Sequence, residues 1–146
     1  MKNIIKNEFD EHLKAANSLY NLTDAVATSA QLCIDCLRNG GKILIFGNGG
    51  SAADAQHIAA ELVGRYKTNR KGLSAIALTT DTSSITSIGN DFGYKHVFNR
   101  QVEALAKKGD VVIGISTSGK SDNVISALKL SSKLNCTTIG FSGQNG

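Results

Sequence analysis

Apolar residues recur with helical spacing through the first 38 residues of the chain. Between residues 3 and 20 the stripe consists of Ile4, Ile5, Phe9, Leu13, Ala16 and Tyr20. Asn39-Gly40-Gly41 ends a second stripe, which is formed by Leu22, Val26, Ala30, Cys33, Ile34 and Leu37. Residues three and four apart share one face of a helix, and glycine commonly follows the last turn. We therefore predict two helices, over residues 3–20 and 22–38.

From residue 42 onward the pattern changes to short, nearly continuous apolar runs. These runs are Lys42–Phe46, Ser74–Leu78, Val111–Ile115 and Thr137–Phe141. Parallel strands that are buried on both faces have this pattern. Helical patterns separate the runs at residues 51–66, 81–89, 95–107 and 121–134. Strands that alternate with helices predict an α/β fold with right-handed crossovers, in which helices cover both faces of a central parallel sheet. The expected architecture is a three-layer α-β-α sandwich that follows an N-terminal helical pair.

The length of 146 residues is that of one ordinary domain. A composition of 41% hydrophobic and 19% charged residues is typical of a globular protein and unlike a disordered chain. No run approaches the roughly 20 apolar residues of a membrane helix. Glu8, Asp10 and Glu11 stand where a signal peptide needs an apolar segment. We predict no membrane partner.

The cysteines favour a reducing compartment. Cys33, Cys36 and Cys136 are odd in number and lack the spacing of a disulfide framework, which predicts a cytoplasmic protein. Cys33 and Cys36 form a CxxC motif, but this motif lies within a helical pattern rather than after a strand. That position argues against a redox or zinc role for the two thiols.

The formal net charge of +4 is compatible with a small anionic substrate. Most basic residues are scattered, and few aromatic residues lie near their one cluster, which is Arg65, Lys67, Arg70 and Lys71. Proteins that bind nucleic acid combine a basic patch with a recognition motif or with stacking aromatic side chains. We interpret the cluster as a solvated loop and predict no nucleic-acid partner.

Two segments match nucleotide-binding motifs. Residues 114–121, GISTSGKS, satisfy the P-loop pattern between a strand and a helix. A nucleotide-hydrolysing P-loop also needs an acidic magnesium ligand at the end of another strand, and Asp81 is the only upstream candidate. Residues 47–52, GNGGSA, fit the loose dinucleotide pattern. Thr79 and Thr80 stand where that pattern expects a ribose-binding acid. The surroundings of both motifs therefore argue against a nucleotide site.

Three of the predicted strands end in unusual loops, Gly47–Ser51, Thr79–Ser83 and Ser116–Ser121. In parallel sheets, ligands bind at the carboxyl ends of the strands. The first and third loops present backbone N–H groups at a helix N-terminus, where the helix dipole favours an anion. The third loop adds several hydroxyl groups, of which Ser121 is placed to cap the next helix. We predict a phosphate monoester site here, and helix capping alone is the alternative interpretation.

The helix after the first loop carries further candidate chemistry. His57 and Glu61 lie one turn apart on one face, with Asp54 a turn earlier. A His and a Glu at this spacing can share a divalent metal, or the Glu can act as a general base. A solvated ion pair explains the spacing equally well. Downstream, Asn90-Asp91 fits either a helix stop and turn or a pair of contacts to a polyol.

Taken together, three segments resemble the sedoheptulose 7-phosphate isomerase (phosphoheptose isomerase) family of SIS-domain proteins. They are GNGGSAADAQHIAAELVGR at 47–65, GNDFGY at 89–94 and GISTSGKS at 114–121. The resemblance covers essentially the whole chain. It implies an SIS-type, flavodoxin-like domain over residues 41–146, and a helical extension over residues 1–40 that packs on the domain and on partner subunits. It also implies a cytoplasmic bacterial enzyme, usually a homotetramer with active sites at subunit contacts.

The resemblance implies that the chain converts sedoheptulose 7-phosphate to D-glycero-D-manno-heptose 7-phosphate, the first step towards the heptose of lipopolysaccharide or related surface glycans. By position it assigns substrate binding to Asn48, Gly49, Gly50, Ser51, Glu61, Asn90, Asp91, Ser116, Thr117, Ser118 and Ser121. His57 and Glu61 match the zinc-associated pair of the family, and Glu61 also matches its acid/base carboxylate. An enediol(ate) isomerisation needs a base and a group that relieves charge on oxygen.

The family pattern continues beyond this sequence with one more strand and a long helix, which carries a Gln and a His of the metal and acid/base site. We therefore expect the chain to be truncated, with further ligands of one zinc ion per site beyond residue 146. Two other functions stay open. A non-catalytic SIS-domain regulator would bind a sugar phosphate or a protein, but such relatives tend to lose the carboxylate at the position of Glu61. The other alternative is an isomerase of a different sugar phosphate.

Overall fold

The computed structural model describes residues 1–143 and contains every helix and strand that the sequence predicts. In chain order the elements are α1 (Lys2–Ser18), η1 (Leu19–Leu22), α2 (Thr23–Arg38), β1 (Ile43–Gly47), α3 (Gly50–Val63), β2 (Ala75–Ala77), α4 (Thr82–Phe92), η2 (Tyr94–His96), α5 (Val97–Leu105), β3 (Val111–Ser116), α6 (Asp122–Lys133) and β4 (Thr137–Ser142).

One boundary differs in a way that concerns the site. Helix α4 continues past its predicted end at residue 89 and stops at Phe92. Gly93 follows it with φ +84, a backbone conformation that favours glycine and ends helices. Asn90 and Asp91 therefore lie in the last turn of α4, and their interpretation as a turn after the helix is wrong.

The four strands form a parallel sheet in the order β2-β1-β3-β4. The chain passes from β1 to β2 on one side and later enters β3 on the other side of β1. The strand order thus reverses between β1 and β3, which is where ligands bind in sheets of this type. Gly47 at the end of β1 pairs with Ile115, and Ser116 then ends β3. The loops that follow these two strands therefore begin side by side.

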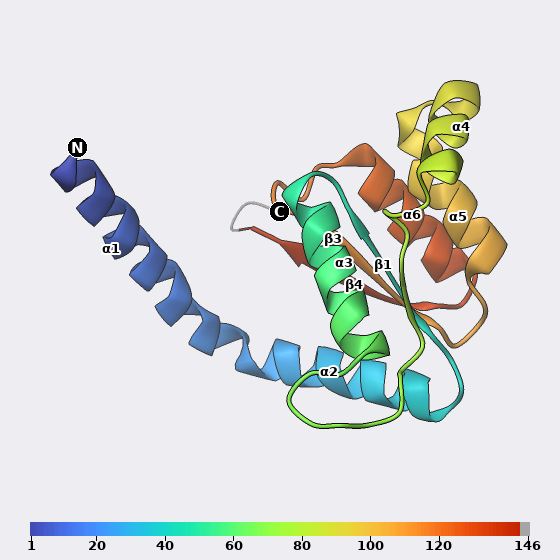
Figure 1. Cartoon of the computed structure of the whole chain (residues 1–146), viewed down its shortest axis with the longest axis horizontal. Coiled ribbons are helices and arrows are strands. Elements are labelled where there is room, and N and C mark those ends of the chain that lie inside the picture. Colours follow the sequence, from blue (N-terminus) through green and yellow to red (C-terminus); the bar gives the residue numbers. More distant parts are fainter. Residues whose placement is uncertain (144–146) are drawn as a thin grey trace. The chain divides into compact units, whose positions relative to one another are not determined.

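Helices cover both faces of the sheet (Figure 1). Side chains alternate along β1, as the pleat of a strand requires. Ile43 and Ile45 pack with residues of α3 and of the end of α2, whereas Leu44 and Phe46 pack with residues of α4, α5 and α6. The structure confirms the predicted three-layer α-β-α sandwich. It places one hydrophobic cluster on each side of the sheet.

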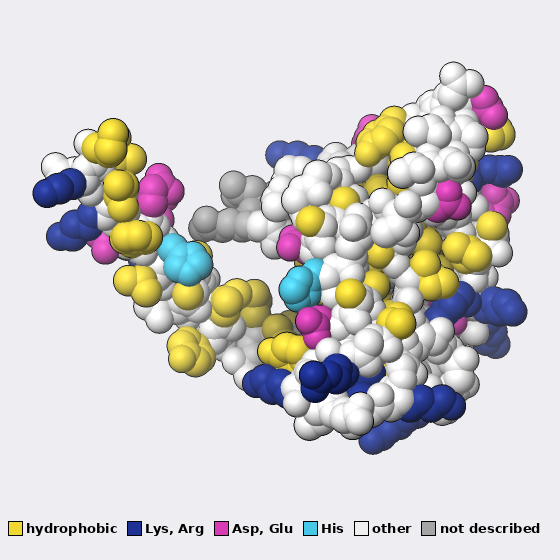
Figure 2. All heavy atoms as spheres, viewed as in Figure 1, with side chains coloured by type: hydrophobic (Ala, Val, Ile, Leu, Met, Phe, Trp, Pro, Cys, Tyr) yellow, Lys and Arg dark blue, Asp and Glu magenta, His cyan; other side chains and the backbone are white. Residues whose placement is uncertain are grey.

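The N-terminal segment Met1–Gln31 is a compact unit, and a second unit begins at Leu32 within α2. The predicted boundary between residues 40 and 41 stays a prediction. Helix α1 has no buried residue, and its apolar side chains Ile4, Phe9 and Leu13 are all more than half exposed. Figure 2 shows hydrophobic side chains along this segment. Among residues 1–143, none of the helices combines the length and the hydropathy needed to span a membrane.

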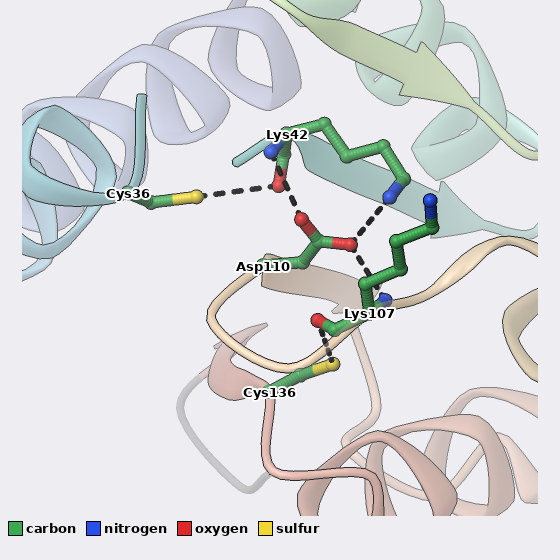
Figure 3. Close-up of polar contacts among 5 residues, drawn as sticks. All are labelled: Cys36, Lys42, Lys107, Asp110 and Cys136. Carbon is green, nitrogen blue, oxygen red and sulfur yellow. Dashed lines mark hydrogen bonds and ion pairs between the residues drawn. The ribbon is translucent and has the colours of Figure 1, made fainter. Parts of the chain in front are cut away.

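Asp110 joins the amino ends of the central strands (Figure 3). Its side chain is only 4% exposed, and its Oδ1 accepts the backbone N–H of Lys42 at 3.0 Å. Oδ2 accepts the Lys42 ammonium group and the backbone N–H of Lys107, the latter at 2.7 Å. Burial alone would raise the pKa of this carboxyl, but the hydrogen bonds from Lys42 and Lys107 outweigh it and hold the pKa below its ordinary value.

Two thiols complete this cluster. Cys36 Sγ donates to the carbonyl oxygen of Lys42 at 3.4 Å, and Cys136 Sγ donates to that of Lys107 at 3.3 Å. Burial raises the pKa of Cys33, Cys36 and Cys136, which keeps the thiols protonated. Reactive thiols have lowered pKa values instead. The cysteines are therefore packing residues in this arrangement.

Candidate functional site

The loop after β1 is a tight turn that depends on two glycines. A Cβ on Gly47 would lie 2.7 Å from Ser51 Cβ and 2.8 Å from the Ile115 carbonyl oxygen, so no side chain fits there. Gly49 has φ +56, a conformation that side chains rarely allow. The turn leads directly into α3, and the N–H of Ser51 donates to the carbonyl oxygen of Asn48 at 3.0 Å. The glycines thus bring the N-terminus of α3 to the end of the sheet.

The loop after β3 closes on itself through its hydroxyl groups. Ser116 Oγ donates to Ser121 Oγ at 3.0 Å, and the backbone N–H of Lys120 donates to Ser118 Oγ at 3.2 Å. Ser121 occupies the predicted N-cap position of α6, but its side chain makes no capping hydrogen bond. The Ser121 hydroxyl is therefore not consumed in capping the helix. This arrangement favours the phosphate interpretation over the capping interpretation.

A pair of asparagine amides links the loop of β1 to the first turn of α6, which follows the loop of β3. Asn48 Nδ2 donates to Asn123 Oδ1 at 2.9 Å, and Asn123 Nδ2 donates back to Asn48 Oδ1 at 2.9 Å. Tyr94 in η2 also donates its hydroxyl to Asn48 Oδ1, at 3.2 Å. Sequence reasoning included Asn48 but missed Asn123 and Tyr94. One feature could have pointed to Asn123: it is a polar residue next to Val124, on the face of α6 that packs against the core.

The candidate metal pair lies on α3, at some distance from its N-terminus. His57 and Glu61 follow Ser51 by about 9 and 15 Å along the helix axis, at about 1.5 Å per residue. His57 Nε2 lies 3.5 Å from Glu61 Oε1, and the two side chains are 76% and 40% exposed. This geometry suits an exposed ion pair and also two ligands of one ion. Within residues 1–143, no group of three or more His, Cys, Asp or Glu residues is arranged to hold a metal.

Asn90 and Asp91 are exposed at the end of α4. Asn90 Nδ2 donates to Asp91 Oδ1 at 2.8 Å. Within residues 1–143 neither side chain is hydrogen-bonded to the two loops, although Tyr94, shortly after them in the chain, reaches Asn48. The structure thus brings the loops of β1 and β3 together, and within residues 1–143 the side chain of Tyr94 hydrogen-bonds the segment after α4 to the loop of β1.

The structure speaks against a nucleotide-hydrolysing P-loop. Asp81, the candidate magnesium ligand, is instead the N-cap of α4. Its two carboxylate oxygens accept the backbone N–H of Ser84 at 3.0 Å and the Ser84 hydroxyl at 2.7 Å. These bonds hold the pKa of Asp81 below its ordinary value. The carboxylate therefore serves the helix end rather than a metal at the loop of β3.

Comparison with known proteins identifies the family. The SIS domain family profile matches residues 8–143. Phosphoheptose isomerase from Helicobacter hepaticus is 57% identical over 146 residues, which is 100% of this chain and 74% of that protein. A phosphoheptose isomerase from Campylobacter jejuni subsp. jejuni serotype O:6 is 56% identical over 100% of this chain and 78% of its own length. The chain belongs to the phosphoheptose isomerase family.

Solved structures of phosphoheptose isomerases agree with this assignment. The enzyme from Neisseria gonorrhoeae superposes with a TM-score of 0.92 and 46% identity, over 99% of this chain and 77% of that chain. The enzyme from Francisella tularensis gives a TM-score of 0.94 at 36% identity, over 99% and 76% of the two chains. The predicted SIS fold and the predicted family are both confirmed.

Proposed function

We propose that this chain is an aldose-ketose isomerase that converts sedoheptulose 7-phosphate to D-glycero-D-manno-heptose 7-phosphate in heptose biosynthesis. The observation that carries the proposal is the 57% identity to a phosphoheptose isomerase along the whole of this chain. The site supports it, because two loops suited to a phosphate and a sugar adjoin at the strand-order reversal of the sheet.

The phosphate would bind at the loop of β3 and the N-terminus of α6. Ser116, Thr117, Ser118 and Ser121 offer hydroxyl groups there, and the helix dipole favours the negative charge. Ser51 would add a contact from the N-terminus of α3. Binding the phosphate fixes the sugar at a point away from the reacting carbons, which lowers the entropic part of the barrier. The sugar would lie along Asn48, Gly49 and Gly50, with its hydroxyl groups reaching Asn90 and Asp91.

Glu61 is our candidate for the catalytic base. In this isomerisation a base takes a proton from C1 of the open-chain ketose and returns it to C2, while a hydroxyl proton moves from O1 to O2. The Glu61 side chain is 40% exposed and has His57 as its neighbour at 3.5 Å. It is therefore accessible to a ligand and held by one partner.

The proposal includes one zinc ion per site. Imidazole and carboxylate groups are common zinc ligands, so His57 and Glu61 fit two of the positions around the ion. The remaining ligands would come from outside residues 1–143 or from another subunit, since the described residues add no third His, Cys, Asp or Glu to the pair. When bound, zinc would polarise the substrate carbonyl or hold substrate hydroxyl groups.

We also propose a homotetramer with active sites at the subunit contacts. The exposed apolar side chains of α1 support this assembly, because large uncovered apolar surfaces mark interaction sites. Sedimentation velocity of the purified protein tests it, and a monomer at micromolar concentration would reject it.

The enzyme would act in the cytoplasm, towards lipopolysaccharide or related surface glycans. Loss of heptose from those glycans in a strain without the gene tests that placement.

The central experiment measures turnover. The zinc-loaded protein is incubated with sedoheptulose 7-phosphate, and the aldose product is followed by NMR. Glu61→Gln is expected to lower kcat by about a hundredfold or more, as the loss of a general base does. Glu103→Gln is the matched control, because Glu103 is exposed on α5 and paired with Arg100 at 2.9 Å. The zinc content of the Glu61 variant tests the metal assignment in the same preparation.

Each outcome separates the alternatives. Absence of turnover by the zinc-loaded protein rejects the isomerase. If binding of the sugar phosphate persists without turnover, the non-catalytic regulator is the better function. Full activity of Glu61→Gln rejects the role of Glu61 as the base while leaving the reaction in place. Turnover of a different sugar phosphate in preference to sedoheptulose 7-phosphate would identify that compound as the substrate and keep the isomerase function.

A further inference from the structure

The amide pair between Asn48 and Asn123 has a fixed orientation. The backbone N–H of Val124 donates to Asn123 Oδ1 at 3.0 Å, and an N–H cannot donate to an NH2 group. Oδ1 of Asn123 must therefore be the atom on that side. Since Asn123 presents Oδ1 and Nδ2 to Asn48 in a set order, the reciprocal bonds also fix which end of the Asn48 amide is oxygen.

This orientation decides what Asn48 offers to a ligand. A side-chain amide has two N–H donors and two acceptor lone pairs. Both lone pairs of Asn48 Oδ1 are used, by Asn123 Nδ2 at 2.9 Å and by the Tyr94 hydroxyl at 3.2 Å. One N–H is used by Asn123 Oδ1. Within residues 1–143 the other N–H has no acceptor, so Asn48 faces a ligand as a hydrogen-bond donor.

We propose that Asn123 is a positioning residue that presents one N–H of Asn48 to an oxygen of the substrate. This inference rests on the proposed isomerase function. The group that this N–H would bind is an oxygen acceptor, such as the carbonyl oxygen or the developing enediolate oxygen of the open-chain sugar. A donor held in a fixed position stabilises negative charge on such an oxygen. Asn123 itself is buried at 4% exposure and acts through Asn48. Asn48 belongs to the loop of β1 and Asn123 to α6, so the reciprocal hydrogen bonds connect these two elements.

A double-mutant cycle tests the proposal. Asn48→Ala and Asn123→Ala should each lower kcat by about a hundredfold, the scale of a misplaced catalytic contact. The double variant should lose no more than either single variant, because both substitutions remove the same oriented N–H. The inhibition constant of inorganic phosphate, which occupies only the phosphate subsite, should stay near its wild-type value. Losses that multiply in the double variant would overturn the proposal, and so would a wild-type kcat in Asn123→Ala.

Two further variants keep the experiment decisive. Asn99→Ala is the matched control, since Asn99 Nδ2 donates to Ser126 Oγ of α6 at 2.7 Å, away from the loops, and its kcat should match the wild type. If Asn123→Ala does not fold, Tyr94→Phe replaces it, because Tyr94 is 60% exposed. Loss of its bond to Asn48 should lower kcat by about two- to tenfold in the wild type. The Tyr94→Phe substitution should leave kcat unchanged when it is added to Asn48→Ala. An equal loss of kcat in both backgrounds would refute the assignment of Asn48 as the oriented donor.

A measurement without substrate separates this inference from the proposed function. In the ligand-free protein, NMR of the Asn48 side-chain NH2 group should show one slowly exchanging proton, and Asn123→Ala should abolish this protection. Unchanged exchange in Asn123→Ala overturns the positioning role whatever the enzyme does. If the wild type converts no sedoheptulose 7-phosphate, the proposed function fails, while the amide measurement still decides whether Asn123 orients Asn48.

Discussion

Asp110 should be a sensitive position for the stability of the sheet. Replacing it by Ala leaves the ammonium group of Lys42, whose side chain is 19% exposed, and two backbone N–H groups without their shared acceptor. Removing one partner of a buried ion pair costs about 3–5 kcal/mol, because the other partner keeps its desolvation cost. We expect Asp110→Ala to reduce the free energy of unfolding by this amount, and Tm to fall by about 10–16 °C for a chain of this size.

The pH dependence of unfolding tests whether the ionised carboxylate of Asp110 stabilises the folded state. The folded pKa of Asp110 lies below its ordinary value, which is about 3.9. The unfolded chain therefore binds the proton more readily, and the stabilisation is fully present above about pH 5. It is lost as the pH falls through the folded pKa. Urea denaturation should accordingly show a gap between wild type and Asp110→Asn that is widest near neutral pH and narrows at acid pH.

The control and the refuting result are both measurable in the same assay. Asp10→Ala removes an exposed carboxylate from α1 and should change the free energy of unfolding by no more than about 0.5 kcal/mol. If Asp110→Ala costs less than about 1 kcal/mol, or if its effect does not change with pH, the carboxylate does not hold the strands as the geometry indicates.

Two further substitutions test the loops. Gly47→Ala should destabilise the fold by about 1–3 kcal/mol, because the new Cβ would lie 2.7 Å from Ser51 Cβ, and an unchanged urea midpoint would contradict this packing. Ser116→Ala removes the hydroxyl that donates to Ser121 and should weaken inhibition by inorganic phosphate by about tenfold, the equivalent of one hydrogen bond to a charged group. Phosphate inhibition equal to that of the wild type would remove Ser116 from the phosphate subsite.

The sequence was sufficient for the architecture because hydrophobic periodicity is a local property. The change from helical stripes to short apolar runs after residue 41 marks the start of the sheet, and the alternation of runs and helices gives its parallel order. The end of α4 was less predictable. Gly89 and Gly93 both qualify as helix stops by residue type, and only the backbone shows that Gly89 continues the helix while Gly93 adopts φ +84.

Contacts between residues that are far apart in the chain could not be predicted from the sequence. Asn123 Nδ2 meets Asn48 Oδ1 across 75 positions, and Asp110 meets Lys42 across 68. Nothing in the local pattern at either end specifies the partner, since asparagine and aspartate are common at loops and helix starts for other reasons. The loops themselves were identified because their glycines and hydroxyl groups are unusual in composition. Their geometry, including the fixed amide, required the register of β1 against β3.

The Asp110 cluster has a consequence for how this scaffold can diverge. It secures the strands at the amino end of the sheet, whereas the candidate site occupies loops at the carboxyl end. Substitutions that reshape the loops for another sugar phosphate therefore leave the anchoring carboxylate and its partners intact. A protein that starts above its stability threshold tolerates more such changes before it unfolds. Loop libraries built on this chain should consequently keep Asp110 and Lys42 constant and direct all variation to the opposite end.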